Sequence, residues 1–272
     1  MMQTNMKILL AILSSNNELY QKTTKTILDA YDEMKNRFKL QCEFDIITIL
    51  SGNKTERVEN IFYVNCNDSD VASKQLAITE YINEHEEYDV IIRTNATTVV
   101  NLNYADIIAR KFLNDDEIYT TSWVWIPDKG FNYPIGSFMM FNKSLFQKYF
   151  SNAQLYNACN DELTRIHKFT VSNKLEYWKG VPDDLVLGYM LLKQNAKIKL
   201  MRCSSFTVGE KHDAISKNLL SFRAKTKDSH AENDYKDRIN IEPLLLKMAA
   251  QLMISNPIED IGRLSYWYLY NF

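Results

Sequence analysis

The sequence has few cysteines and no excess of charge of either sign. Its 272 residues include four cysteines, and these are scattered without a CxxC pair or a zinc-ligand spacing. Reduced, buried thiols in a cytosolic protein are therefore the default interpretation. The formal net charge is −2, which is not the basic balance of a protein that binds nucleic acid. We therefore expect no nucleic-acid partner.

Long apolar runs are also missing. No stretch approaches the ~18 consecutive apolar residues that a membrane-spanning helix needs. Residues 7–13 imitate the charged and apolar regions of a signal peptide, but this apolar run is short and no small-residue cleavage site follows it. A first buried strand fits the segment better. We therefore expect a cytoplasmic protein, and an association with the membrane face stays open.

What the sequence does contain is an alternation of strand and helix patterns. Apolar residues make up 46% of the chain, enough for a large core. Strands are predicted over residues 7–13, 43–50 and 61–64 and from Val90, with helices before residue 38 and after Asp68 or Ser69 as the N-cap. Strands that alternate with helices in this way predict βαβ crossovers and a largely parallel sheet.

The second half of the chain has a different pattern. Further strands are predicted over residues 119–126, 136–141 and 197–201, where β-branched and aromatic residues cluster. Further helices are predicted over residues 104–113, 143–149, 161–167, 182–192 and 242–254. Residues 204–240 are polar without a hydrophobic period, and we expect them to be irregular. This half therefore predicts a mixed rather than a strictly parallel sheet.

One stretch joins a buried strand to polar residues. The apolar run that starts at Val90 is followed by Arg93-Thr94-Asn95. Ligands of open α/β sheets bind at the carboxyl ends of the strands. An arginine at the end of a buried strand loses hydration unless it meets an anion. Arg93 is therefore a candidate anion ligand. The alternative, a solvated loop whose Asn and Thr cap a helix, stays open.

Three segments, taken in order, resemble one enzyme family. Residues 88–102, YDVIIRTNATTVVNL, resemble the (K/R)-T-D-D-D-V-F-V-N segment of the fringe and β1,3-galactosyltransferase family, which has an R-T-N version in bacterial relatives. Residues 133–145 resemble its YP…G…Y-V-L-S strand, and residues 181–188, VPDDLVLG, its P-E-D-V-Y-V-G motif. Together with the first strand, the resemblance covers roughly residues 7–205.

The resemblance implies a GT-A-type α/β fold with a mostly parallel central sheet, a mixed second half and helices on both faces. Residues 1–205 would form the catalytic domain. Residues 206–272 would form an irregular segment and a C-terminal helical extension packed on the same domain. The implied activity is that of an inverting glycosyltransferase of the hexosyltransferase type. It would move a sugar from a nucleotide-diphosphate donor, a UDP-sugar, to a hydroxyl of a glycan or lipid-linked glycan in polysaccharide or glycoconjugate biosynthesis. A homo-oligomer stays open.

The resemblance assigns catalysis to the two aspartates of VPDDLVLG. Asp184 falls on the family's catalytic aspartate, the general base, and Asp183 falls on the acid that precedes it. The alternative is structural. Pro182 followed by two aspartates is an ordinary helix start, because carboxylates are favoured near the positive end of the helix dipole.

The remaining assignments concern the donor and the acceptor. The residues expected to bind the donor are Ser14, Ser15, Lys74, Arg93, Asn95 and Thr97, with Lys74 and Arg93 as cations for the diphosphate. Trp123 and Trp178 are expected to form apolar platforms for the acceptor sugar. The alternatives are that the serines only cap the first helix, that Lys74 is solvated and that the tryptophans belong to the core.

The metal site departs from the family pattern. The acidic triplet of the family falls on Asn95-Ala96-Thr97, which contains no carboxylate. Asn95 and Thr97, with His212, can offer neutral ligands to Mn²⁺ or Mg²⁺, or Arg93 and other cations can replace the metal. Two other functions stay open. One is a catalytically silent domain that binds a nucleotide sugar or glycan. The other is an unrelated nucleotidyltransferase, which would need paired carboxylates near the fourth strand.

Overall fold

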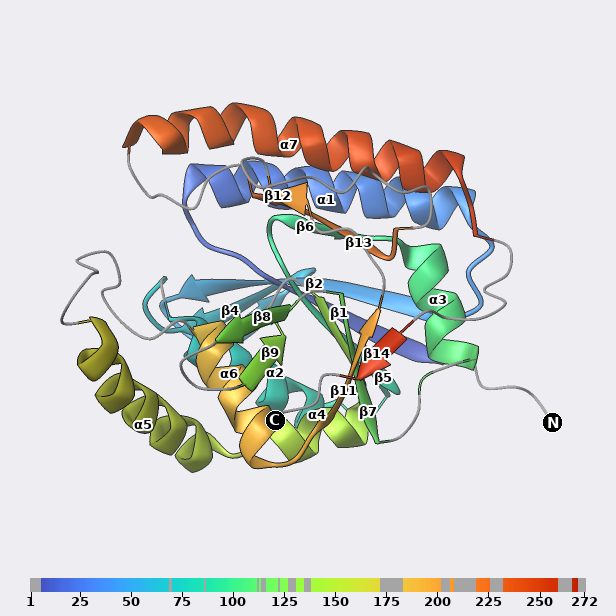
Figure 1. Ribbon diagram of the computed structural model, residues 1–272. Helices are drawn as coiled ribbons and strands as arrows, with labels where there is room; N and C mark the ends of the chain where they lie inside the picture. The colour runs from blue at the N-terminus through green and yellow to red at the C-terminus, as the bar shows by residue number, and fades with distance from the viewer. Residues whose placement is uncertain are drawn as a thin grey trace.

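The computed structural model describes residues 6–68, 70–85, 87–111, 113, 116–121, 123–126, 131–134, 138–171, 183–201, 206–207, 219–225, 232–258 and 266–268. These residues form a three-layer α/β fold, in which a central sheet lies between two layers of helices (Figure 1). Among the described residues, no helix is long and apolar enough to span a membrane. The three cysteines that the structure describes are free thiols.

The central sheet is mixed and mostly parallel, as the sequence predicts. Within the described residues it has nine strands in the order β14-β11-β7-β10-β5-β1-β2-β4-β3. The parallel pairs involve β1 (Lys7–Leu13), β2 (Glu43–Gly52), β4 (Ile61–Asn65), β5 (Val90–Asn95), β7 (Glu117–Thr120) and β11 (Lys197–Met201). The antiparallel strands are β3 (Glu56–Val58), β10 (Phe138–Asn142) and β14 (Tyr266–Tyr268).

Strand β1 shows why the sequence of a central strand is a continuous run of apolar residues. Ile8, Leu10 and Ile12 belong to the hydrophobic core on one face, while Leu9, Ala11 and Leu13 belong to the core on the other. Successive side chains of a strand point to opposite faces. A strand covered on both faces therefore needs apolar residues at every position.

The helices divide between the two faces of the sheet. One layer contains α1 (Glu18–Arg37), α3 (Leu102–Lys111) and α7 (Glu232–Ser255), and Figure 1 shows α7 running alongside α1. The other layer contains α2 (Val71–Glu84), α4 (Lys143–Phe150), α5 (Ala153–Val171) and α6 (Asp183–Lys193). In α1, the residues Ile27, Tyr31 and Met34 are fully buried at helical spacing.

The segment that the sequence predicts to be irregular is partly regular, so that prediction is wrong for three stretches, of which the two-residue strand β12 (Phe206–Thr207) is the shortest. Helix α7 begins at Glu232 rather than at residue 242, and β13 (Ser221–Lys225) precedes it. The period of α7 is concealed because its buried face includes the ion pair of Arg238 with Glu242, whose side chains are 2% and 0% exposed. Charged residues on a buried face remove the hydrophobic signal that marks a helix.

Two smaller sheets complete the described structure. Strand β13 lies between β12 (Phe206–Thr207) and β6 (Thr98–Val100) in a three-stranded sheet. Strands β8 (Trp123–Ile126) and β9 (Phe131–Pro134) form an antiparallel pair. The single strand predicted over residues 119–126 is therefore two strands, β7 and β8, in different sheets. The aromatic C-terminal segment contributes β14, which pairs with β11.

Candidate functional site

A pocket of about 710 Å³ opens at the carboxyl ends of β1 and β5. The register of the sheet explains its position, because Leu13 of β1 lies opposite Asn95 of β5 on one side and Ile49 of β2 on the other. The loops that follow these parallel strands therefore meet at one edge of the sheet. All six residues predicted to bind the donor line the pocket: Ser14, Ser15, Lys74, Arg93, Asn95 and Thr97.

The loop after β1 is held by side-chain hydrogen bonds. Asn17 is the N-cap of α1, and its side-chain oxygen accepts a hydrogen bond of 3.0 Å from the backbone N–H of Tyr20. The serines have other partners: the hydroxyl groups of Ser14 and Thr24 lie 2.9 Å apart, and the Ser15 hydroxyl donates to Asp68. Asn17 is thus the residue that caps α1, and it lines the pocket together with both serines.

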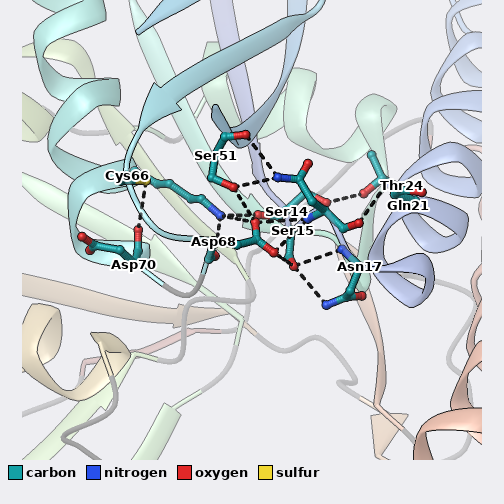
Figure 2. Close-up of polar contacts among 11 residues, drawn as sticks. Ser14, Ser15, Asn17, Gln21, Thr24, Ser51, Cys66, Asp68 and Asp70 are labelled. Carbon is teal, nitrogen blue, oxygen red and sulfur yellow. Dashed lines mark hydrogen bonds and ion pairs between the residues drawn. The ribbon is translucent and has the colours of Figure 1, made fainter. Parts of the chain in front are cut away.

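Asp68 organises this edge of the pocket, as Figure 2 shows. Its carboxylate accepts hydrogen bonds from the Asn16 backbone N–H at 3.0 Å and from the Ser51 hydroxyl at 2.7 Å, besides that from Ser15. Burial alone would raise the pKa of Asp68, but these hydrogen bonds and the charge of Lys74 hold that pKa below its usual value. The carboxylate is therefore ionised at neutral pH.

The predicted role of Asp68 as a helix cap is wrong. Asp70 is the N-cap of α2, and its side chain accepts a hydrogen bond of 2.9 Å from the backbone N–H of Ser73. A carboxylate before a helix has the same sequence signature whether it caps that helix or binds elsewhere. The long-range partners of Asp68 therefore had no signal in the sequence.

Lys74 is buried rather than solvated. Its side chain is 1% exposed, although it belongs to α2. The ammonium group donates to the backbone oxygens of Ser14 and Asp68, both at 2.8 Å, and lies 3.4 Å from the Asp68 carboxylate. These three acceptors match the three donors of an ammonium group. Lys74 therefore ties α2 to the loop after β1 at the wall of the pocket.

Arg93 lies inside β5, not in a solvated loop after it. Its backbone lies opposite Ala11 of β1 and Met139 of β10, and its side chain is 2% exposed. Strand β5 has a hydrogen-bonded neighbour on each side, and these backbone hydrogen bonds do not depend on the side chains. The strand therefore continues through the polar residues 93–95 and ends at Asn95. The guanidinium group therefore reaches the pocket from the floor of the sheet.

The turn after β5 gives Asn95 a structural role. Its side-chain oxygen accepts hydrogen bonds from the Thr97 backbone N–H at 3.2 Å, the Thr97 hydroxyl at 3.1 Å and the Thr98 hydroxyl at 2.8 Å. This oxygen would have to give up those donors to bind a metal. Among the described residues, no group of three His, Cys, Asp or Glu residues can hold a metal ion. Asn95 and Thr97, as arranged here, do not fit a Mn²⁺ or Mg²⁺ site.

Three cations reach the pocket from the C-terminal part of the chain: Arg223 and Lys225 of β13, and Arg238 of α7. None of the three stands out from the sequence as a site residue, because the surrounding segment shows no hydrophobic period. A short signal was present, however. In residues 221–225, SFRAK, the apolar Phe222 and Ala224 alternate with the two basic residues, as in a strand with one buried face.

The other predicted site residues are not tested by the geometry. Asp183 and Asp184 are the first two residues of α6, but their side chains lie outside the described part of the structure. The same holds for the side chain of Trp123 in β8. Trp178 and His212 lie outside the described residues altogether.

Comparisons with known proteins find structural likeness alone. No family model matches the sequence, and no curated protein matches it. Among solved structures, the galactosyltransferase LgtC in complex with donor and acceptor sugar analogues is 12% identical, with 90% of this chain and 95% of that chain covered and a TM-score of 0.48. A glycosyltransferase involved in glycosylation of the major capsid of PBCV-1 is 12% identical, with 85% and 98% covered and a TM-score of 0.43.

A structure of an active-site mutant of LgtC gives similar values, with 11% identity, 90% and 96% coverage and a TM-score of 0.44. The chain itself has an α/β fold, with a mixed, mostly parallel sheet flanked by helices. Identities this low leave the function to be inferred from the residues of this chain.

Proposed function

We propose that the protein is an inverting glycosyltransferase that uses a nucleotide-sugar donor, a UDP-sugar, and a glycan or lipid-linked glycan acceptor in surface polysaccharide or glycoconjugate biosynthesis. One observation carries the proposal. Five basic residues line the pocket at the carboxyl ends of β1 and β5, where Asp68 is the one acidic residue among the described lining residues. A nucleoside diphosphate is an anion that such a pocket attracts and holds.

The donor would lie across the ends of β1 and β5. Arg93 supplies a guanidinium group beneath the diphosphate, and the backbone around Ser14 and Ser15 borders the space for the nucleoside. Lys74 contributes indirectly, because its ammonium group donates its hydrogen bonds to the loop after β1 and to Asp68. Its role in donor binding would be to hold the loop in place. The cations also stabilise the negative charge that the diphosphate gains as it leaves.

Asp184 is the proposed general base, with Asp183 beside it as a second acid. The carboxylate of Asp184 takes the proton of an acceptor hydroxyl. The acceptor oxygen then forms a bond to the anomeric carbon as the bond from that carbon to the diphosphate oxygen breaks. Attack occurs on the face opposite the leaving group, so the configuration inverts. Trp123 and Trp178 are proposed to stack against the acceptor sugar.

The direction of α6 supports this role for the aspartates. Strand β11 runs parallel to β7, and both run in the direction of β5, because β10 is antiparallel to β5 and to β7. Helix α6 ends at Lys193, close in sequence to the start of β11 at Lys197. A helix of 11 residues is about 16 Å long. The start of α6 is thereby directed back towards the sheet edge that bears the pocket.

The experiment is a thermal-shift screen of the full chain against a panel of sugar nucleotides, with free nucleosides as controls. A ligand at 100 times its Kd stabilises the folded state by about 2.7 kcal/mol. A hit is then incubated with candidate acceptor sugars, and release of the nucleoside diphosphate is measured. Binding without release would favour the silent binding domain, to which the lack of carboxylates at residues 95–97 also points. No stabilisation by any sugar nucleotide would refute the proposal.

A further inference from the structure

Strand β13 carries two basic residues to the pocket on the same face. Phe222 and Ala224 are fully buried in the core, whereas Arg223 and Lys225 are partly exposed and line the pocket. Residues two apart on a strand point the same way. The pairing with β6 fixes where they point, because Arg223 lies opposite Thr98. Both cations are thus set beside the turn of residues 95–98.

A backbone hydrogen bond ties β13 to that turn. The backbone N–H of Ala224 donates to the backbone oxygen of Thr97 over 2.8 Å. Residues 95–97 are the place where the family that the sequence resembles has an acidic triplet. Here, a strand with positive charges on either side of Ala224 is attached directly to the uncharged triplet Asn95-Ala96-Thr97. The two features are therefore neighbours in space, although more than 120 residues separate them in the sequence.

Arg223 has a donor that the described part of the protein does not use. Its Nε is buried and has no hydrogen-bond partner among the residues that the structure describes. A buried donor without a partner is destabilising, so an arginine placed this way indicates a missing acceptor. Arginine presents its donors in a planar fork that matches phosphate oxygens, which makes a phosphate group a fitting acceptor.

In the described part of the pocket, the side-chain oxygens of Asn95 and Asp68 are already engaged and are not free to bind a divalent cation. The Asn95 side-chain oxygen accepts three hydrogen bonds within the turn, and the Asp68 carboxylate accepts from Ser15, Asn16 and Ser51 and lies beside Lys74. A hard cation between them would have to displace these donors and tolerate the surrounding positive charges.

We propose that the pocket binds a diphosphate without a divalent cation, with Arg223 and Lys225 of β13 and Arg93 of β5 taking the place of the metal. This inference rests on the proposed function, because it assigns the diphosphate of the nucleotide-sugar donor to these residues. It also gives residues 221–225 a role, because β13 adds Arg223 and Lys225 to the anion site that Arg93 of the central sheet helps to form.

The test is calorimetric titration of the full chain with inorganic pyrophosphate in EDTA and, separately, with Mn²⁺. We expect binding in EDTA that Mn²⁺ does not strengthen. Arg223→Met and Lys225→Met should each weaken pyrophosphate binding about 10-fold to 100-fold, the usual effect of losing a hydrogen bond to a charged group. Arg165→Met removes an exposed arginine on α5 and is the matched control, with binding expected as in the wild type.

Thermal unfolding separates a binding role from a structural one. Because Nε of Arg223 has no partner among the residues described, Arg223→Met should leave the Tm of the ligand-free protein unchanged or raised. Arg223→Lys retains the charge and should bind pyrophosphate more tightly than Arg223→Met. If Arg223→Met does not fold, Lys225→Met and Arg223→Lys decide the question by the same titration.

The proposal is overturned by any of three results: pyrophosphate binds only with Mn²⁺, it does not bind under either condition, or both β13 variants bind as the wild type does. An equal loss of pyrophosphate binding in Arg165→Met would also overturn the proposal, because that result would show a general effect of the charge of the protein. Failure of the proposed function looks different. In that case pyrophosphate still binds in EDTA and depends on Arg223, but no sugar nucleotide is bound or turned over.

Discussion

The ammonium group of Lys74 donates a hydrogen bond of 2.8 Å to the backbone oxygen of Ser14, from a helix 60 residues further along the chain. This contact links α2 to the loop after β1, and the Asp68 carboxylate completes it. The pocket wall is thus held by a buried cation whose donors are met by the protein. Mutation can therefore distinguish cations that stabilise the pocket wall, whose loss lowers stability, from cations that bind the ligand, whose loss lowers affinity.

Lys74→Met should lower the free energy of unfolding of the protein. The folded variant should lose less free energy of pyrophosphate binding than it loses in stability. The variant leaves the backbone oxygens of Ser14 and Asp68 without a buried donor, which we expect to cost about 2–3 kcal/mol. Urea denaturation measures the loss, and Lys25→Met, an exposed lysine of α1, is the control. Unchanged stability together with weaker pyrophosphate binding would instead make Lys74 a direct ligand of the diphosphate.

Asp68→Asn should lower the Tm at pH 7 by a small amount that vanishes in acid. The folded-state pKa of Asp68 lies below its unfolded value of about 3.9, so its stabilisation is present above that pH and is lost as the pH falls through the folded pKa. The side chain is 38% exposed, so solvent screening should keep the effect to at most about 1 kcal/mol.

Thermal scans from pH 7 to pH 3 of the wild type and Asp68→Asn test this dependence. The two Tm values should converge below pH 4. Asp29→Asn, an exposed aspartate of α1, serves as the control for the loss of one negative charge. A difference that persists unchanged at pH 3 would show that Asp68 does not stabilise the fold through its ionised form.

Tyr31→Phe should destabilise the protein by about 1–2 kcal/mol. The Tyr31 hydroxyl is buried and accepts a hydrogen bond of 3.1 Å from the backbone N–H of Val100, which joins α1 to β6. Burial also raises the pKa of Tyr31, so the hydroxyl stays protonated throughout the accessible pH range. Urea denaturation gives the value, and Tyr63→Phe on β4 is the control. Equal stability of Tyr31→Phe and the wild type would contradict the assigned hydrogen bond.

Asp184→Asn should reduce turnover by roughly 10²-fold or more with little change in donor binding, since it removes the basicity and keeps the size. Asp183→Asn should affect stability more than turnover, because a carboxylate in the first turn of α6 interacts favourably with the helix dipole. Steady-state rates and thermal shifts of both variants measure this. The reverse order would exchange the two roles, and full activity of both would refute the mechanism.

Local signals in the sequence are sufficient to predict several elements of the fold. Residues 7–13 form β1 with the predicted bounds, because a strand buried on both faces must be apolar at every position. The helices that follow β1 and β10 also begin at local signals, because the side chains of Asn17 and Asn142 accept hydrogen bonds from the first turns of these helices. Arg93 could be singled out as a site residue because an arginine in a buried apolar run stands out without knowledge of its neighbours.

Which side chains share the pocket depends on contacts between distant segments, and these are visible in the folded structure alone. Asp68 binds Ser51 and the loop after β1, and Arg223 lies opposite Thr98; both relationships join segments that are far apart in the chain. Hydrophobic periods report which face of an element is buried, but not what covers that face. The paired charges of Arg238 and Glu242 even removed the period of α7, because their mutual contact is what makes their burial tolerable.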